Sequence, residues 1–109
     1  MTFEDYEIQA MKTNNHDLDW YENVQHSIFM LSSEVGEIAG PFQKFFFQGH
    51  DVPNHDEMVK EMGDVLWALN KLAYMLGSSL DEVAEANIEK LRLRYGEKFS
   101  EERSVNREI

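Results

Sequence analysis

The spacing of the apolar residues is the feature that most limits the fold, because it is helical along the chain. In the second quarter of the sequence, apolar side chains recur at intervals of four and three, which places them in one stripe on a helix. They are Val24, Ile28, Leu31, Val35 and Ile38. No segment alternates polar and apolar residues for long, and only two prolines interrupt the chain. We therefore expect an all-α protein.

About four helices are expected, the later two opening at N-cap pairs and ending at glycines. They cover about residues 3–12, 17–47, 54–76 and 79–95. Gly40 and Pro41 should kink or end the second helix, with a turn or two of helix beyond them. The N-cap pairs are Asn54 with Glu57 and Ser79 with Glu82.

The third and fourth helices carry apolar stripes of their own. The stripe of the third lies at residues 58, 62, 65, 69, 72 and 76, and that of the fourth at 80, 84, 88, 91 and 95. Both stripes should face inward. Since short connections favour antiparallel neighbours, we expect an antiparallel helical bundle.

The length and net charge of the chain restrict its domain organisation and the classes of molecule that it can bind. With 109 residues the chain suits one domain, residues 1–109, in which residues 98–109 could form a flexible tail or a flap. A formal net charge of -11 would repel a nucleic-acid backbone, so no nucleic-acid polymer is expected. There is no cysteine, no apolar run long enough to span a bilayer and no secretory N-terminus. We expect a cytoplasmic protein without a membrane partner.

An acidic pattern occurs twice. "LSSEVGEI" and "MVKEMGDV" have an apolar residue, Glu, Gly and an acid at equal positions. At about 100° per residue, the acids lie at nearly the same offset to one side of each apolar stripe. Antiparallel helices that pack stripe to stripe bring such flanks to the same side. The four carboxylates expected to converge are those of Glu34, Glu37, Glu61 and Asp64.

Four carboxylates at one place raise one another's pKa values unless a cation neutralises them. Oxygen ligands suit a hard ion, Mg²⁺ or Mn²⁺. Gly36 and Gly63 lower the helix propensity inside the motifs, which indicates close approach of a backbone or a ligand. A single E-x-x-E motif usually lies on a solvent-exposed helix face. For the repeated motif, both a metal site and a solvent-exposed face remain possible interpretations. His26 lies on the same flank and is a weaker candidate for contacting the metal ligands without binding the metal itself.

The fourth helix carries amide and cationic residues at a similar offset from its stripe. Asn87, Lys90 and Arg94 would suit a phosphate chain, since a metal neutralises some oxygens and Lys or Arg the rest. Lys44 and Lys98 could add to them. An ordinary exposed face is the alternative.

Several aromatic residues point away from the stripes, where a monomer would expose them. They are Phe29, Phe47, Trp67 and Tyr74. A second apolar face on a small helical domain indicates a subunit interface, and a wall for stacking a base is the alternative for any one of them. We expect a homo-oligomer.

These residues resemble a known family. "EVGE" followed by "EMGD", then "GDVLWALNKLA" and "SLDEVAEANIEKLRLRYGEKFS", are similar to the motifs of the MazG-like, all-α nucleoside triphosphate pyrophosphohydrolases. The resemblance runs over about residues 20–100. It implies packed helices in homodimers or homotetramers, and Mg²⁺-dependent hydrolysis of a nucleoside triphosphate between the α and β phosphates to the monophosphate and pyrophosphate.

The resemblance also implies roles for individual residues. Glu34, Glu37, Glu61 and Asp64 would ligate Mg²⁺, with Glu37 and Glu61 taken as catalytic and Glu37 as the carboxylate that orients the attacking water. Asn87, Lys90, Arg94 and Lys44 would contact the phosphates. Trp20, Trp67 and Tyr95 are candidates for the base. The alternatives are a dUTP or phosphoribosyl-ATP pyrophosphohydrolase on the same scaffold, a non-catalytic helical oligomer that binds a nucleotide or a metal, and an interaction module.

Overall fold

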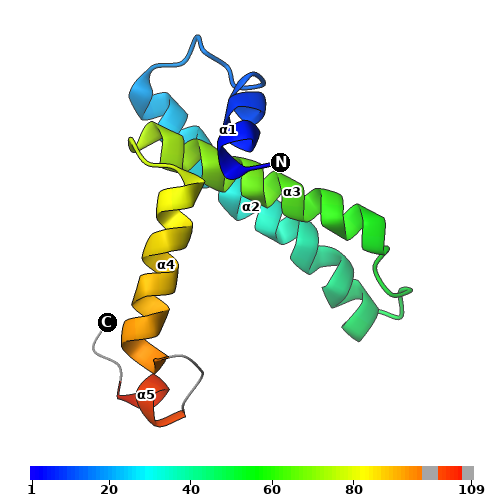
Figure 1. The fold of residues 1–109 in the computed structure, drawn as a ribbon. Coiled ribbons are helices and arrows are strands. Elements are labelled where there is room, and N and C mark those ends of the chain that lie inside the picture. Colours follow the sequence, from blue (N-terminus) through cyan, green and yellow to red (C-terminus); the bar gives the residue numbers. More distant parts are fainter. Residues whose placement is uncertain (97–100, 107–109) are drawn as a thin grey trace.

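The computed structural model describes residues 1–96 and 101–106, and the regular structure in them is entirely helical. The helices are α1 (Phe3–Met11), α2 (Trp20–Phe47), α3 (His55–Met75), α4 (Leu80–Tyr95) and α5 (Glu101–Val105). Figure 1 shows them in chain order. The prediction of an all-α fold is confirmed. The short helix α5 falls in the segment expected as a tail, while Lys98 lies outside the described residues.

The helices begin where the sequence supplies a side chain for their free N–H groups. Asp19 and Glu22 form a capping box at α2. The predicted N-caps of α3 and α4 are also confirmed, since Asn54 accepts the N–H of Glu57 at 3.0 Å and Ser79 accepts that of Glu82 at 3.2 Å. Gly77 and Gly96 follow the ends of α3 and α4 with φ of 74° and 72°, a conformation that other residues adopt at a cost.

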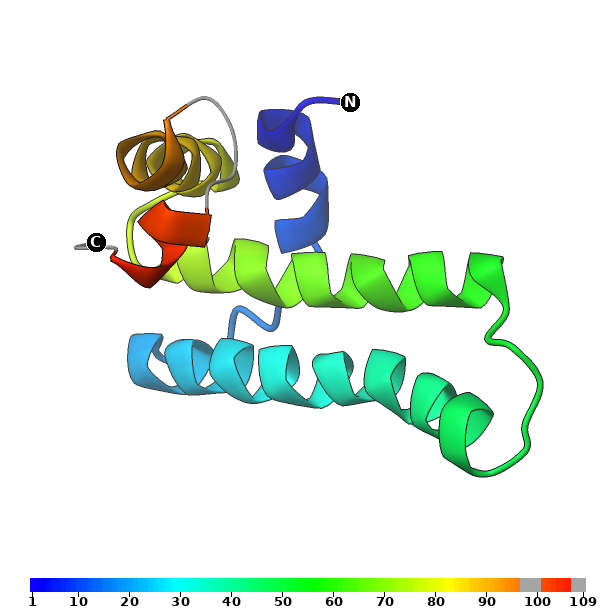
Figure 2. The same ribbon diagram turned by 90° about the horizontal axis from the view of Figure 1, so that it is seen from below.

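Helices α2 and α3 form an antiparallel pair along most of their length (Figure 2). Helix α2 passes through Gly40 and Pro41 without interruption and ends at Phe47. The expectation that Gly40 and Pro41 could end the helix is therefore wrong, because the surrounding turns continue past the one N–H that proline lacks. The long pairing places the middle of α2 beside the middle of α3.

Helix α1 stands across α3 (Figure 2). Trp67 of α3 anchors it there. The Nε1–H of Trp67 donates to the carbonyl of Ala10 at 3.1 Å and to Oγ1 of Thr13 at 2.9 Å. Trp67 is half-buried as a result, so the expectation that a monomer would expose it is wrong. Phe29, Phe47 and Tyr74 are exposed as expected.

Helix α4 runs away from the α2–α3 pair (Figure 1). Leu80 is its buried residue, and every residue from 81 to 93 is exposed. The expectation that the stripe at Ala84, Ile88 and Leu91 faces inward is wrong within one chain. The turn at Gly77 and Ser78 directs α4 past the end of the pair, so Ala84, Ile88 and Leu91 stay exposed although α4 contacts α1, α3 and α5 elsewhere.

The isolated chain is open rather than compact. Its accessible surface is 8275 Å², whereas a compact protein of this size exposes about 6,300 Å². Its radius of gyration is 17.2 Å, against about 13 Å for a compact domain of this length. The α2 stripe is only partly covered, with Ile28 and Val35 exposed. A large apolar area therefore faces solvent in the single chain.

None of the helices in the described part of the chain combines the length and the apolar character that crossing a bilayer requires.

Candidate metal centre

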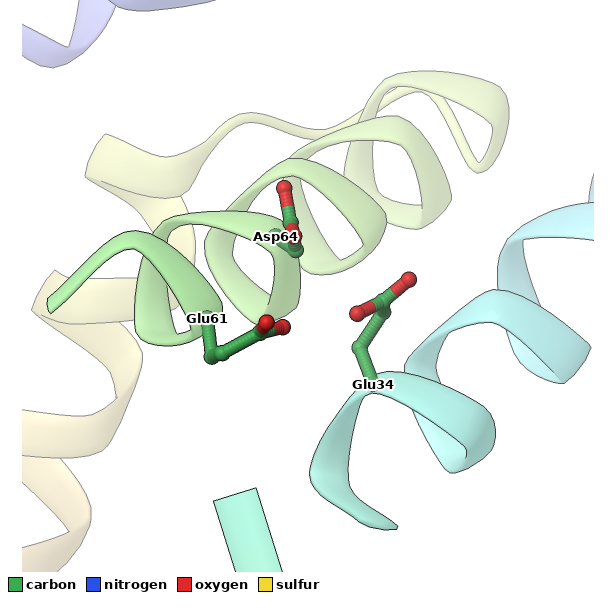
Figure 3. A group of neighbouring side chains, drawn as sticks. All are labelled: Glu34, Glu61 and Asp64. Carbon is green, nitrogen blue, oxygen red and sulfur yellow. The ribbon is translucent and has the colours of Figure 1, made fainter. Parts of the chain in front are cut away.

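Three of the four repeated acids meet between α2 and α3. Glu34 comes from α2, and Glu61 and Asp64 come from α3. Carboxylate oxygens of the three lie within 4.8 Å of one another. Figure 3 shows Glu34 and Glu61 reaching toward each other across the gap between the helices, with Asp64 beside them. The equal offset of the motifs and the antiparallel pairing explain this meeting, and we call the group of three the acid centre.

Glu37 lies one turn beyond Glu34 and stands outside the acid centre. It is exposed, and its negative charge is nevertheless among the causes that raise the pKa of Glu34. Within the described residues the structure thus brings together three of the four predicted carboxylates and places the fourth at the edge of the group.

The electrostatics of the acid centre are unfavourable without a cation. Partial burial raises the pKa of Glu34, and the negative charges of Asp64, Glu61 and Glu37 raise it further. Such a shift means that the surroundings disfavour the ionised carboxylate. A bound cation would reverse the sign of this interaction, because the same oxygens would then surround a positive charge.

The donor set fits a hard divalent ion. All donors are carboxylate oxygens, which Mg²⁺ and Mn²⁺ prefer as ligands. Zinc sites, in contrast, usually contain His or Cys. Mg²⁺ holds oxygens at about 2.0–2.1 Å, so opposite ligands of one ion are about 4.2 Å apart. Oxygens that already lie within 4.8 Å of one another need only small side-chain rotations to reach that spacing.

The predicted phosphate-binding residues are not beside the acid centre in the single chain. Asn87 and Lys90 are exposed on α4, which leads away from the α2–α3 pair (Figure 1). Arg94 is half-buried near the end of α4, with its guanidinium 5.8 Å from the ring centroid of Tyr95. Lys44 is exposed near the end of α2, ten residues or about 15 Å beyond Glu34.

The candidate base-binding residues are spread over the fold. Trp20 opens α2, fourteen residues or about 21 Å before Glu34, and its Nε1–H donates to the carbonyl of Met75 at 2.7 Å. Trp67 is one turn from Asp64, but its ring N–H is bound to α1. Tyr95 is half-buried at the end of α4. One chain does not gather these three around the acid centre.

His26 has a different partner from the one expected. Its Nδ1 lies 2.8 Å from Nζ of Lys71, a fully buried residue of α3, and its ring meets that of Trp67 edge to face. Burial and the charge of Lys71 lower the pKa of His26. The histidine therefore belongs to the junction of α2 and α3 with α1.

The two midhelix glycines do not mark a close approach within the chain. A Cβ built on Gly36 or Gly63 would have no heavy atom from outside its own stretch of helix within 4 Å. The expectation of a closely packed backbone at these positions is wrong for the single chain, because both glycines are exposed.

Tyr6 is a residue near the acid centre that the sequence motifs did not indicate. It is half-buried on α1, and its pKa is raised by burial and by the carboxylate of Asp64. Nothing in the periodicity of α1 points to it, since its position depends on how α1 crosses α3.

Comparison with known proteins places most of the chain in one family. Residues 22–99 match the MazG nucleotide pyrophosphohydrolase domain. The Gene 37 protein of Mycobacterium phage L5 is 32% identical over 96 residues, which are 82% of this chain and 84% of that protein. The uncharacterized protein YvdC of Bacillus subtilis (strain 168) is 35% identical over 74 residues, 60% of this chain and 69% of that protein. No solved structure matches significantly.

Proposed function

Because the chain belongs to the MazG nucleotide pyrophosphohydrolase domain family, we propose that it hydrolyses a nucleoside triphosphate between the α and β phosphates. The products would be the nucleoside monophosphate and pyrophosphate, and Mg²⁺, or Mn²⁺ in its place, would be the cofactor. The observation that carries this proposal is the meeting of Glu34, Glu61 and Asp64 from two helices, with oxygens within 4.8 Å of one another.

The acid centre and Glu37 would divide the chemistry between them. Glu34, Glu61 and Asp64 would hold the ion, which when bound offsets phosphate charge and lowers the pKa of a water for in-line attack. Glu37 stands at the edge of the group and is exposed. It could therefore accept a proton from the attacking water without giving up a ligand position, which is the role of a general base.

We also propose that the active form is a homodimer or homotetramer. The single chain exposes about 2,000 Å² more than a compact protein of its size, which is in the range that stable interfaces bury. Apolar residues of α4, including Ile88 and Leu93, are exposed along its length. Packing between copies would cover them and would allow Asn87, Lys90, Arg94 and Lys44 to reach the phosphates of a nucleotide at an acid centre.

A metal- or nucleotide-binding oligomer without turnover is the second candidate. It is favoured by the course of α4, which leads away from the α2–α3 pair and carries Asn87 and Lys90 away from the acid centre of the same chain (Figure 1). In that case the ion would bind and stabilise the fold, and no nucleotide would be cleaved.

Release of pyrophosphate separates the two candidates. The full chain is incubated with each common NTP and dNTP, dUTP and phosphoribosyl-ATP, with and without Mg²⁺. We expect turnover that requires the ion, and its loss in Glu61→Gln, which removes a negative ligand without a change of shape. Glu85→Gln, an exposed change on α4, is the matched control. Ion-dependent stabilisation without any turnover would favour the binding protein, and an active Glu61→Gln would remove Glu61 from the site.

A further inference from the structure

One side of α2 carries a row of large apolar residues at intervals of seven. The row consists of Tyr21, Ile28, Val35 and Phe42, all of which are exposed. A second apolar row follows three residues behind the first, at positions 24, 31, 38 and 45. The two rows together form the heptad pattern of helices that pack side by side in bundles. Within one chain, however, the first row is left in solvent.

The exposed row lies on the side of α2 away from the flank of its acids. At about 100° per residue, the row is about 60–120° from the fully buried Ser27 in one sense. Glu37 and His26 are about 80–100° from Ser27 in the other sense. The row therefore extends along the flank of α2 that does not contribute to the acid centre.

Helix α3 has a matching pair of exposed apolar residues. Val59 and Met62 are exposed, and they lie about 60–120° from the half-buried Val65 in the same sense as the row on α2. Asp64 lies about 100° from Val65 in the other sense. Because α2 and α3 pair antiparallel, equal senses fall on the same side of the pair. Opposite the acid centre, the pair thus presents one apolar surface, which we call the uncharged face.

The uncharged face consists of Tyr21, Ile28, Val35, Phe42, Val59 and Met62.

Charged residues of α2 are confined to the other side of the helix. They are Glu22, Glu34, Glu37 and Lys44. All four lie between about 20° and 140° from Ser27, in the sense opposite to the exposed row. Charged residues make up 28% of the chain, so a solvated flank of this length should carry some of them. Depletion of charge is instead typical of the core of a protein interface.

We propose that the uncharged face packs against the uncharged face of a second copy of this chain, so that two α2–α3 pairs form a four-helix bundle. This inference rests on the proposed homo-oligomer and assigns to it a surface separate from α4. Each copy carries a net charge of -11, so two copies can approach closely only where neither presents its charges. An isologous contact brings one surface against itself, and the uncharged face meets that condition.

The exposed area is large enough for this interface in addition to one at α4. The single chain exposes about 2,000 Å² more than a compact protein of its size, whereas one partner contributes about 800 Å² to a standard interface. The shape is suitable as well, because the small residues Ser32 and Ala39 lie between the large ones and leave holes for the side chains of a partner helix.

The mass of the full chain in light scattering tests the proposal without any substrate. Val35→Asp puts a negative charge in the middle of the uncharged face, and we expect the mass to fall to half that of the wild type at equal concentration. Ser32→Asp, an exposed change on the same side of α2, should lower the mass in the same direction. Ser33→Asp is the matched control, since it adds the same charge one residue further, on the acidic side, and should keep the wild-type mass.

Circular dichroism of each variant shows whether the helices are retained. If Val35→Asp fails to fold, Ser32→Asp decides, because an exposed serine contributes little to the fold. Folded Val35→Asp and Ser32→Asp proteins with the wild-type mass would refute the interface. A Ser33→Asp protein that dissociates as they do would refute it too, since added charge on either side of α2 would then have the same effect.

The failure of this inference can be told apart from the failure of the proposed function. A monomeric wild type would overturn both the interface and the proposed homo-oligomer, and would leave the uncharged face to a different protein partner. An oligomer that resists the substitutions on the uncharged face overturns the interface alone. Release of pyrophosphate is measured separately on the wild type, so an absence of turnover would count against the proposed hydrolysis and not against the interface.

Discussion

Lys71 is a buried cation without a carboxylate partner among the ion pairs of the described residues, and its replacement should stabilise the protein. Its side chain is fully buried in α3. Nζ donates to Nδ1 of His26 at 2.8 Å and lies 5.7 Å from the ring centroid of Trp67. These contacts recover only part of the free energy that an ammonium loses on leaving water.

The size of the effect follows from that balance. Methionine has a similar volume and no charge, and the exposed ring of His26 can be hydrated once Nζ is gone. We expect Lys71→Met to raise the free energy of unfolding at neutral pH by about 1–2 kcal/mol, as other replacements of buried charges do. For a chain of this length that corresponds to a rise in Tm of about 4–9 °C.

The pH dependence gives a second, independent readout. Burial lowers the pKa of Lys71 below its ordinary 10.5. Between the lowered value and 10.5 the folded protein therefore binds fewer protons than the unfolded chain, so wild-type stability should rise with pH through this window. The advantage of Lys71→Met should shrink as the pH rises toward 10.5, because the wild-type amine then loses its charge.

Urea unfolding at neutral and alkaline pH measures both effects, with Lys60→Met as the matched control on the exposed side of α3. The control should change the free energy of unfolding by less than about 0.5 kcal/mol. A Lys71→Met protein that is less stable than the wild type, or whose advantage does not depend on pH, would show that the buried ammonium is well compensated and would refute the reasoning.

Four further outcomes are expected. Trp67→Phe should lower the free energy of unfolding by about 0.5–1.5 kcal/mol in urea, since one N–H donor that serves two acceptors is lost. Gly63→Ala should raise it by about 0.8–1 kcal/mol, because a Cβ there meets nothing within 4 Å; a loss would instead indicate a neighbour from another copy. Ile88→Asp should shift the mass in light scattering toward the monomer, and an unchanged mass would exclude this part of α4 from the interface. Because the pKa of Glu34 is raised above its ordinary 4.5, the folded state takes up a proton more readily than the unfolded chain. In chelator, stability should therefore rise as the pH falls through that raised pKa, a rise that Glu34→Gln should lack in urea titrations at several pH values.

Much of the local structure could be predicted from the residues alone. Helix caps act within one helical turn, so their effect can be predicted without knowledge of the fold. Examples are the N-caps Asn54 and Ser79 and the terminating glycines Gly77 and Gly96. The meeting of Glu34 with Glu61 and Asp64 could also be predicted, since it needs only helical geometry and an antiparallel pairing. Proline was less reliable, because the helix around Pro41 continues for turns on both sides.

Contacts between distant helices were beyond such reasoning. The exposure expected for Trp67 was wrong because α1 crosses α3 at that residue, and no periodic pattern records where two helices cross. The same crossing places Tyr6 where the negative charge of Asp64 raises its pKa. The expectation that α4 packs inward was wrong for a similar reason. A stripe such as Ala84, Ile88 and Leu91 shows that one face of a helix is apolar, but it does not show which surface that face packs against.

The sequence by itself determined that this protein is helical, that two acidic motifs flank matching stripes, and that these motifs resemble those of nucleotide pyrophosphohydrolases. Only the tertiary structure decided that Glu37 stands aside from the other three carboxylates, that Lys71 is buried beside His26, and that α4 leaves the pair. The physical reason is that periodicity encodes the angle of a side chain about its own helix axis, whereas the crossing of helices depends on packing summed over many residues.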